Sequence, residues 1–229
     1  MSYINFNNAG SSYLTEKTQK IVKDFFDYEN IVGGYNAENL FKNKLNEFYF
    51  NASKLINCDP KEISFLQNST YAWNFFLNSI HFRKNDNVVI LDNEYGSNLI
   101  GILNKKINHK ISKINTNGQV CFEDLKSKID KKTKIVFACH IASQCGDVIE
   151  IEKIGKLLKK INENIIFVVD ACQSIGQVNI DVKKQKFDVL VGSGRKYLRG
   201  PRGTGLLYVN KNIKTKISPF ILDIKNCLV

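Results

Sequence analysis

The sequence is poor in the features that mark fibrous, linker-like or membrane-spanning chains. It has only three prolines in 229 residues and no serine- and glycine-rich tract, which excludes a collagen-like or linker-dominated chain. Its longest apolar stretches, such as residues 88–91 and 165–169, are far shorter than the about 20 residues that cross a bilayer. Residues 1–10 are polar and lack the apolar core of a secretory signal. We therefore expect a soluble, cytoplasmic protein.

The six cysteines also lack the spacing of a metal site. No C-x-x-C pair occurs, and no cysteine and histidine stand at the distances typical of zinc ligands. In a cytoplasmic protein such cysteines are expected to be reduced and structural. The sequence predicts no metal.

What is present is enough apolar material for one large domain and an excess of positive charge. Hydrophobic residues make up 43% of the chain, and 33 Lys and Arg stand against 22 Asp and Glu, a net charge of +11. A basic surface can bind nucleic acid through its phosphates. The lysine pairs, however, are spread along the chain, so nucleic-acid binding is kept only as the weakest alternative.

Strand-like and helical patterns alternate for most of the length. Helical spacing of apolar residues predicts helices over residues 15–28, 40–56, 72–80, 97–105, 122–129 and 151–161. Short apolar runs predict strands over residues 63–66, 88–91, 109–114, 133–139, 165–169, 189–192 and 205–209. This alternation is typical of an α/β fold with a mostly parallel central sheet flanked by helices.

Polar residues follow nearly every predicted strand. Ligands of such sheets bind outside the carboxyl ends of the strands, so these segments are the candidates for chemistry. They are residues 67–70 (QNST), 92–95 (DNEY), 140–143 (HIAS), 170–173 (DACQ) and 193–196 (SGRK). Neither G-x-x-x-x-G-K-[ST] nor a G-x-G-x-x-G in a strand–turn–helix context occurs, which argues against a simple nucleotide-binding enzyme.

Each of these residues also has a purely structural interpretation. Asp170 could cap its own turn, or it could pair with the protonated ring nitrogen of a cofactor. Ser69 and Thr70 could cap the helix that follows, or they could cradle a phosphate at its N-terminus. Tyr95 could pack on the core or cover a flat ring. Lys196 could be a solvated surface lysine, as a lone lysine usually is, but it stands between two glycine-rich turns that allow a ligand to approach the backbone closely.

The motifs at residues 67–70, 94–98 (EYGSN), 168–174 (VVDACQS) and 193–205 (SGRKYLRGPRGTG) resemble, in order and spacing, the class V aminotransferase superfamily. These are fold type I pyridoxal phosphate enzymes, among them cysteine desulfurases, selenocysteine lyases, isopenicillin-N-epimerase-like proteins and the sulfoxide lyase of ergothioneine synthesis. The resemblance runs from residue 6 to about residue 223. The segments 7–12 (NNAGSS), 33–38 (GGYNAE) and 69–73 (STYAW) are more similar to the lyase and epimerase-like branch.

The resemblance implies pyridoxal 5′-phosphate as the cofactor and a role for several residues. Lys196 would be the catalytic residue, forming the Schiff base, and Asp170 would pair with the pyridine nitrogen. Gln173 would bind the O3′ oxygen of the ring. Ser143 falls where desulfurases carry an asparagine near that oxygen.

The resemblance also implies which residues contact the phosphate of the cofactor and which contact the substrate. Thr70 and Ser193 would hold the phosphate with Ser69 nearby, and Arg195, which replaces a histidine of the desulfurases, would suit the same group. Tyr95 occupies the place of a histidine that stacks on the ring. Asn8 and Tyr35 would line the substrate side.

The resemblance further implies desulfurase-like C–S lyase chemistry on a small amino acid, in a homodimer. Members of this superfamily have a smaller C-terminal domain, which would begin where this chain stops, so residues 1–229 are expected to be the large domain with its N-terminal segment. That domain could be a separate chain. The alternative is a truncated, non-catalytic remnant that at most binds the cofactor, and we expect poor activity from the isolated chain.

Overall fold

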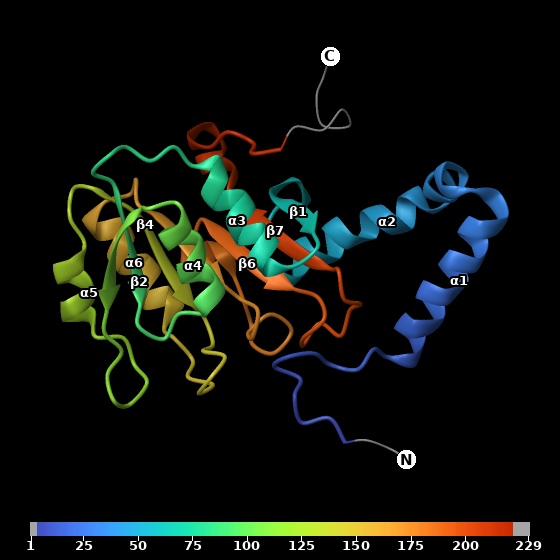
Figure 1. Ribbon diagram of the computed structural model, residues 1–229, viewed down its shortest axis with the longest axis horizontal. Helices are drawn as coiled ribbons and strands as arrows, with labels where there is room; N and C mark the ends of the chain where they lie inside the picture. Colours follow the sequence, from blue (N-terminus) through green and yellow to red (C-terminus); the bar gives the residue numbers. More distant parts are fainter. Residues whose placement is uncertain (1–3, 222–229) are drawn as a thin grey trace.

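Residues 4–221, which the computed structural model describes, contain a seven-stranded sheet at their centre (Figure 1). The strand order is β1-β7-β6-β5-β4-β2-β3. The strands are β1 (Ile63–Leu66), β2 (Asn87–Leu91), β3 (Asn108–Ser112), β4 (Thr133–Cys139), β5 (Ile166–Asp170), β6 (Val189–Ser193) and β7 (Gly205–Val209). All seven predicted strands are present, with ends that differ by no more than two residues.

The sheet is parallel apart from β7, which pairs antiparallel with both β1 and β6. The pairs β2–β3, β2–β4, β4–β5 and β5–β6 are parallel. Because only β7 is reversed, the carboxyl ends of β1, β2, β4, β5 and β6 meet at one edge of the sheet. This confirms the predicted α/β class, and it brings the polar strand-end segments together.

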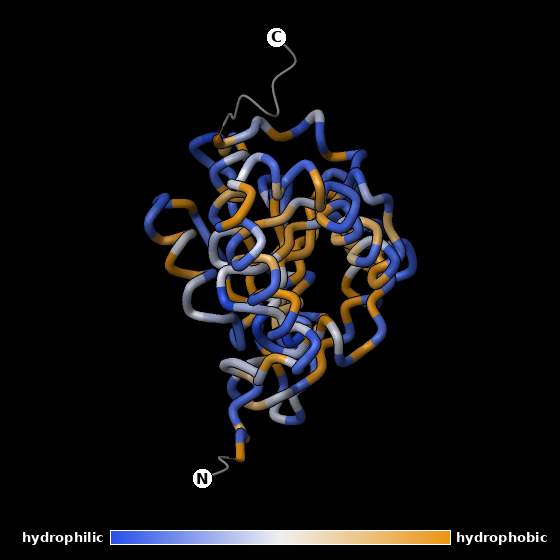
Figure 2. The backbone as a smooth tube through the Cα atoms, turned by 90° about the vertical axis from the view of Figure 1, so that its right-hand side faces the viewer, coloured by the Kyte–Doolittle hydropathy of each residue, from blue (hydrophilic) through white to orange (hydrophobic). Residues whose placement is uncertain are grey.

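Helices cover both faces of the sheet. One face packs against α3 (Ser69–Ser79) and α4 (Gly96–Asn104), and the other against α2 (Gly34–Ile56), α5 (Phe122–Lys128), α6 (Ile151–Ile161) and α7 (Val182–Gln185). Side chains of β2 alternate between the two cores, Val88 and Ile90 on the α3 side and Val89 and Leu91 on the α6 side. Figure 2 shows the hydrophobic strands enclosed by helices of mixed hydropathy.

A long helical hairpin leaves this body. The helix α1 (Glu16–Val32) is followed at once by α2, and the two project away from the sheet in Figure 1. Thr15 is the N-cap of α1, since its side chain accepts a hydrogen bond from Thr18 N. Phe41 of α2 contacts Phe25 and Tyr28 of α1 edge to face, yet α1 has no buried residue.

Some boundaries differ from the sequence-based prediction. The helix expected at residues 72–80 begins at Ser69 because Asn68, and not Ser69 or Thr70, is its N-cap, with its side chain accepting from Tyr71 N. The helix α7 and the 3-10 turns Pro60–Glu62 and Lys211–Lys216 were not predicted, since one-turn segments carry no periodicity. Among the described residues, no helix is long and apolar enough to cross a membrane. Of the six cysteines expected to be reduced and structural, Cys227 lies outside residues 4–221.

Candidate functional site

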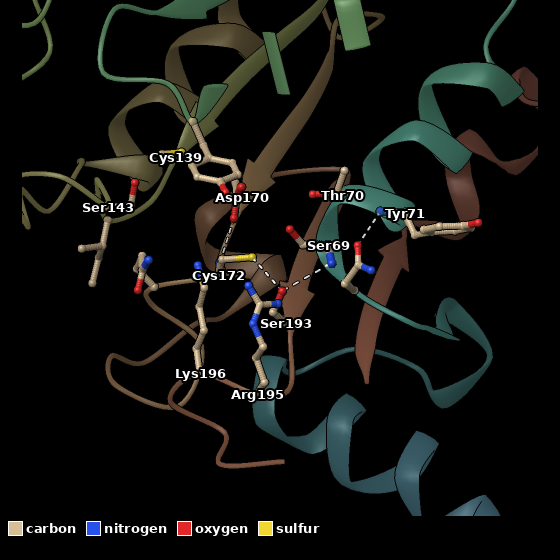
Figure 3. A pocket seen from close by; sticks show the side chains of 14 residues that line it. Ser69, Thr70, Tyr71, Cys139, Ser143, Asp170, Cys172, Ser193, Arg195 and Lys196 are labelled. Atoms are coloured by element: carbon tan, nitrogen blue, oxygen red, sulfur yellow. Dashed lines mark hydrogen bonds between the residues drawn. The ribbon is translucent and has the colours of Figure 1, made fainter. Parts of the chain in front are cut away.

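A pocket of about 320 Å³ opens at the edge where the parallel strands end (Figure 3). All nine residues predicted to bind a cofactor line it. The lining residues are Asn68, Ser69, Thr70, Tyr71, Tyr95, Cys139, Ile141, Ser143, Asp170, Cys172, Gln173, Ser193, Arg195 and Lys196. Residues up to 128 positions apart in the chain therefore meet in one place, because parallel strands end at the same edge.

Asp170 is the last residue of β5 and is only 3% exposed. Its Oδ1 accepts a hydrogen bond from the backbone N–H of Cys172 at 2.8 Å, so it does cap its own turn. Its Oδ2 accepts from the side-chain amide of Asn98 at 2.9 Å. A buried carboxylate needs such donors, and these two hold it in a defined orientation at the pocket wall.

Lys196 is 7% exposed and follows β6 through a tight loop. Within residues 4–221 no carboxylate lies within 4.0 Å of its amine, and the amine instead sits 5.8 Å from the centre of the Tyr95 ring. A Cβ on Gly194 would collide with Thr204 Oγ1, so this glycine lets residues 194–204 fold back on themselves. The loop is closed by Gly194 N donating to Thr204 O and Gly200 N donating to Gly194 O, each at 2.8 Å.

The first turn of α3 forms one side of the pocket. Ser69 and Thr70 are its first two residues, and Ser69 N donates to Ser193 Oγ at 3.4 Å. The helix dipole and the hydroxyl groups of this turn favour an anion at such a position. Figure 3 shows the Arg195 side chain lying beside Ser193 on this side.

An N-terminal segment, residues 9–12, is hydrogen-bonded to two residues that line the pocket. Gln173 Nε2 donates to the carbonyl of Ala9 at 3.1 Å, and Arg195 Nε donates to the carbonyl of Gly10 at 3.2 Å. Ser12 N donates back to the Arg195 carbonyl at 2.9 Å. The orientation of two predicted site residues therefore depends on a segment more than 160 positions away.

The two residues predicted to contact substrate do not line the pocket. Asn8 belongs to the same N-terminal turn and accepts a hydrogen bond from Asn5. Tyr35 is 85% exposed on the first turn of α2 and lines a separate hollow with Phe25 and Glu29. Their substrate contacts stay predictions, and for Tyr35 this single chain does not bring the side chain to the pocket.

Five lining residues were not predicted as site residues, namely Asn68, Tyr71, Cys139, Ile141 and Cys172, and Glu94 and Asn98 lie behind the pocket. Burial and the nearby Asp170 raise the pKa of Glu94 to about 7. Burial also raises the pKa of Cys172 to about 12 and that of Cys139 well above its usual value. One ligand atom each of Glu94, Cys139 and Asp170 lies within 4.8 Å of the others, a spacing that could hold a metal ion, so the expectation of no metal stays a prediction.

The stability of the folded protein is expected to depend on pH through His140, which directly follows β4. Burial lowers its pKa to about 4, below the value of about 6.5 in an unfolded chain. The unfolded state therefore takes up the proton first, and the stability should fall as pH drops from about 6.5 to about 4.

The melting temperatures of the wild type and His140→Gln are measured at about pH 7.5, 5.5 and 4.5. We expect the melting temperature of His140→Gln to fall by less than that of the wild type as the pH is lowered. Carboxylates with a lowered pKa, such as Asp130, contribute mainly below about pH 4, because that is the pKa of an unfolded aspartate. His109→Gln is the matched control and should melt in parallel with the wild type. Parallel curves for His140→Gln would contradict the assignment.

Comparison with known proteins agrees with this geometry. A family model described as Aminotransferase class-V matches residues 3–223. A protein of Pyrococcus abyssi named probable cysteine desulfurase is 37% identical over 170 residues, covering 72% of this chain and 42% of the relative. Cysteine desulfurase SufS of Plasmodium falciparum is 28% identical over 233 residues, covering 94% of this chain and 42% of the relative.

A solved structure has the same fold. The apo structure of a cysteine desulfurase from Thermococcus onnurineus NA1 superposes with a TM-score of 0.85 at 26% identity, covering 96% of this chain and 56% of that one. The chain thus spans about half the length of the relatives that it matches.

Proposed function

Because the chain belongs to the class V aminotransferase family, we propose that its pocket binds pyridoxal 5′-phosphate and carries out desulfurase-like C–S lyase chemistry on a small amino acid such as cysteine. Lys196 is the catalytic residue in this proposal. The observation that carries it is the presence of a buried lysine and a buried aspartate, Lys196 and Asp170, in one pocket with an anion-binding helix N-terminus.

The donor set of the pocket suits this cofactor. The first turn of α3 with Ser69, Thr70 and Ser193 offers N–H and hydroxyl groups for a phosphate, and Arg195 adds a positive charge. Gln173 Oε1 is buried and has no partner among the described residues, so this oxygen is available to a ligand group. The ring of Tyr95 offers a flat face at the pocket.

Each protein group then has a task that its position allows. The bound cofactor would supply the electron sink that the protein lacks. The Asp170 carboxylate would pair with a protonated ring nitrogen and keep the proton there, and Gln173 would orient the ring. The Lys196 amine would hold the cofactor covalently and, once displaced by the substrate amine, accept the proton from the substrate Cα.

The thiols at the pocket are not suited to accept sulfur. A thiolate is the reactive form of cysteine, and burial keeps Cys139 and Cys172 protonated by raising their pKa values. We therefore assign these two residues to the wall of the pocket. The sulfur would leave as sulfide, keeping the electrons of the broken Cβ–S bond, or a thiolate other than these two would attack it while it is still bonded to Cβ.

We also propose a cytoplasmic homodimer in which residues 4–221 are the cofactor-binding half of the enzyme. The helix α1 supports an additional contact, since it has no buried residue and exposes Ile21, Phe26 and Ile31. A second copy of this chain or a separate chain carrying the C-terminal domain would suit that surface.

The cofactor assignment is tested by reductive trapping. Purified protein is mixed with pyridoxal 5′-phosphate and treated with borohydride, which fixes the cofactor to the lysine that holds it. We expect one adduct per chain, on the peptide containing Lys196, together with a visible absorption band before reduction. Adducts spread over surface lysines, in proportion to their exposure, would overturn the assignment.

A further inference from the structure

A hydrogen-bonded chain runs behind the pocket from Glu94 through Asn98 to Asp170. The side-chain amide of Asn98 donates to Asp170 Oδ2 and to Glu94 Oε1, each at 2.9 Å. An amide nitrogen carries two hydrogens, so the two carboxyl groups use both. Asn98 is 0% exposed, so water cannot replace either bond.

The surrounding core fixes the backbone of Asn98. The indole N–H of Trp73 donates to the Asn98 carbonyl at 3.0 Å, and Trp73 itself stacks on Phe137 of β4 with ring centres 4.5 Å apart. A Cβ on Gly101, one turn further along α4, would lie 3.1 Å from Trp73 Nε1, so α4 and α3 approach closely there. Asn98 therefore stands at a fixed distance from the end of β5.

Glu94 holds the Asn98 amide in the rotamer that reaches Asp170. Its Oε1 accepts from Asn98 Nδ2, from the Tyr95 backbone N–H at 2.7 Å and from the Cys139 thiol at 2.9 Å. Its Oε2 is buried with no partner among the described residues. A buried carboxyl group with one oxygen saturated and the other unpaired is costly for a purely structural role.

We propose that Asn98 and Glu94 are positioning residues that act through Asp170, holding its carboxylate in the orientation in which it receives the cofactor's ring nitrogen. This deepens the proposed function and rests on it. With Oδ1 bound to Cys172 N and Oδ2 bound to Asn98, the Asp170 carboxylate cannot rotate, and its remaining lone pairs are available to the pocket.

The same chain adds a titrating charge behind Asp170. The groups facing Glu94 are Asp170 of β5, Cys139 of β4 and the Asn98 amide of α4, while the Lys196 amine lies 5.8 Å from the centre of the Tyr95 ring. Burial and the charge of Asp170 raise the pKa of Glu94 to about 7. As pH rises through this value Glu94 gains negative charge, which favours the protonated form of a bound pyridine ring.

The experiment compares cofactor binding in matched variants. Pyridoxal 5′-phosphate is titrated into the wild type, Asn98→Ala, Asn98→Asp, Glu94→Gln and the control Asn87→Ala, and the visible absorption band and Kd are recorded at about pH 6, 7 and 8. Asn87 is also a buried asparagine that donates to an aspartate, Asp130, at 3.0 Å, but at the opposite end of β2. Thermal unfolding is measured for every variant.

We expect Asn98→Ala and Asn98→Asp to raise Kd about tenfold, which corresponds to about 1.4 kcal/mol, and to shift the band. We expect Glu94→Gln, which keeps the acceptor oxygen, to bind within about threefold of the wild type while the band loses its change near pH 7. Asn87→Ala should lower the melting temperature but leave Kd and band unchanged.

The outcomes separate the two proposals. If the wild type forms no lysine-dependent band, the proposed function fails and this inference fails with it. If the wild type binds and both Asn98 variants match it in Kd and band, the positioning role alone is overturned. Should Asn98→Ala not fold, the nearly isosteric Asn98→Asp and Glu94→Gln decide the question.

Discussion

Replacing Lys196 by alanine is expected to abolish the lysine-dependent absorption band with pyridoxal 5′-phosphate and to lower any turnover of cysteine by about 10²–10⁴-fold or more, the range for a general acid–base group. The amine is buried, and Lys196 is the one lysine among the described residues that line the pocket, so no other described lysine of the pocket can replace it. Absorption spectra and a sulfide-release assay measure the two effects.

Two controls show whether the effect needs the amine itself. One keeps the positive charge at position 196, and the other removes an exposed lysine elsewhere. Lys196→Arg keeps the positive charge but loses the amine, so it should also lack the band. Lys156→Ala removes an exposed lysine of α6 that pairs with Glu152, and it should behave as the wild type. A band of wild-type intensity in Lys196→Ala would rule out the catalytic assignment.

Replacing Trp73 by alanine is expected to destabilise the fold by about 3–5 kcal/mol, the usual cost of truncating a buried tryptophan. Trp73 is 0% exposed, stacks on Phe137 and donates its indole N–H to the Asn98 carbonyl. The substitution removes the packing between α3 and the sheet together with that hydrogen bond. Urea unfolding at constant pH measures the change as a lower midpoint.

Two variants calibrate this effect. Trp73→Phe keeps most of the ring contact but loses the hydrogen bond, so we expect a cost of about 1–2 kcal/mol. Ile100→Ala, at a residue of α4 that is 64% exposed, should change stability by no more than about 0.5 kcal/mol. If Trp73→Ala unfolded at the same midpoint as Ile100→Ala, the structure around α3 would be wrong.

Much of the fold and of the pocket could be read from local patterns. The predicted strands of residues 133–139 and 165–169 are apolar on both faces, which a sheet covered by helices requires, and polar residues follow them directly. Once parallel pairing is inferred, Ser69, Asp170 and Lys196 must meet at one edge, although each is far from the others in the chain. The structure confirms that meeting.

Other parts depend on contacts that no local pattern encodes. Glu94 and Asn98 stand four residues apart, an ordinary helical spacing, and only the packing of α4 against β5 places the Asn98 amide on Asp170. The N-terminal segment is another example. Its carbonyls accept hydrogen bonds from Gln173 and Arg195 only when the segment lies beside the carboxyl ends of the strands.

The sequence by itself determined the α/β class, the strands and the polar edge, because periodicity and strand-end polarity are properties of neighbouring residues. Tertiary structure alone decided the reversal of β7, the exposure of α1, the thiols of Cys139 and Cys172 in the pocket wall and the pair Glu94 and Asn98 behind it. These depend on long-range register and on the distance between layers, and a side chain's burial and partners, which set its pKa, exist only once those layers have packed.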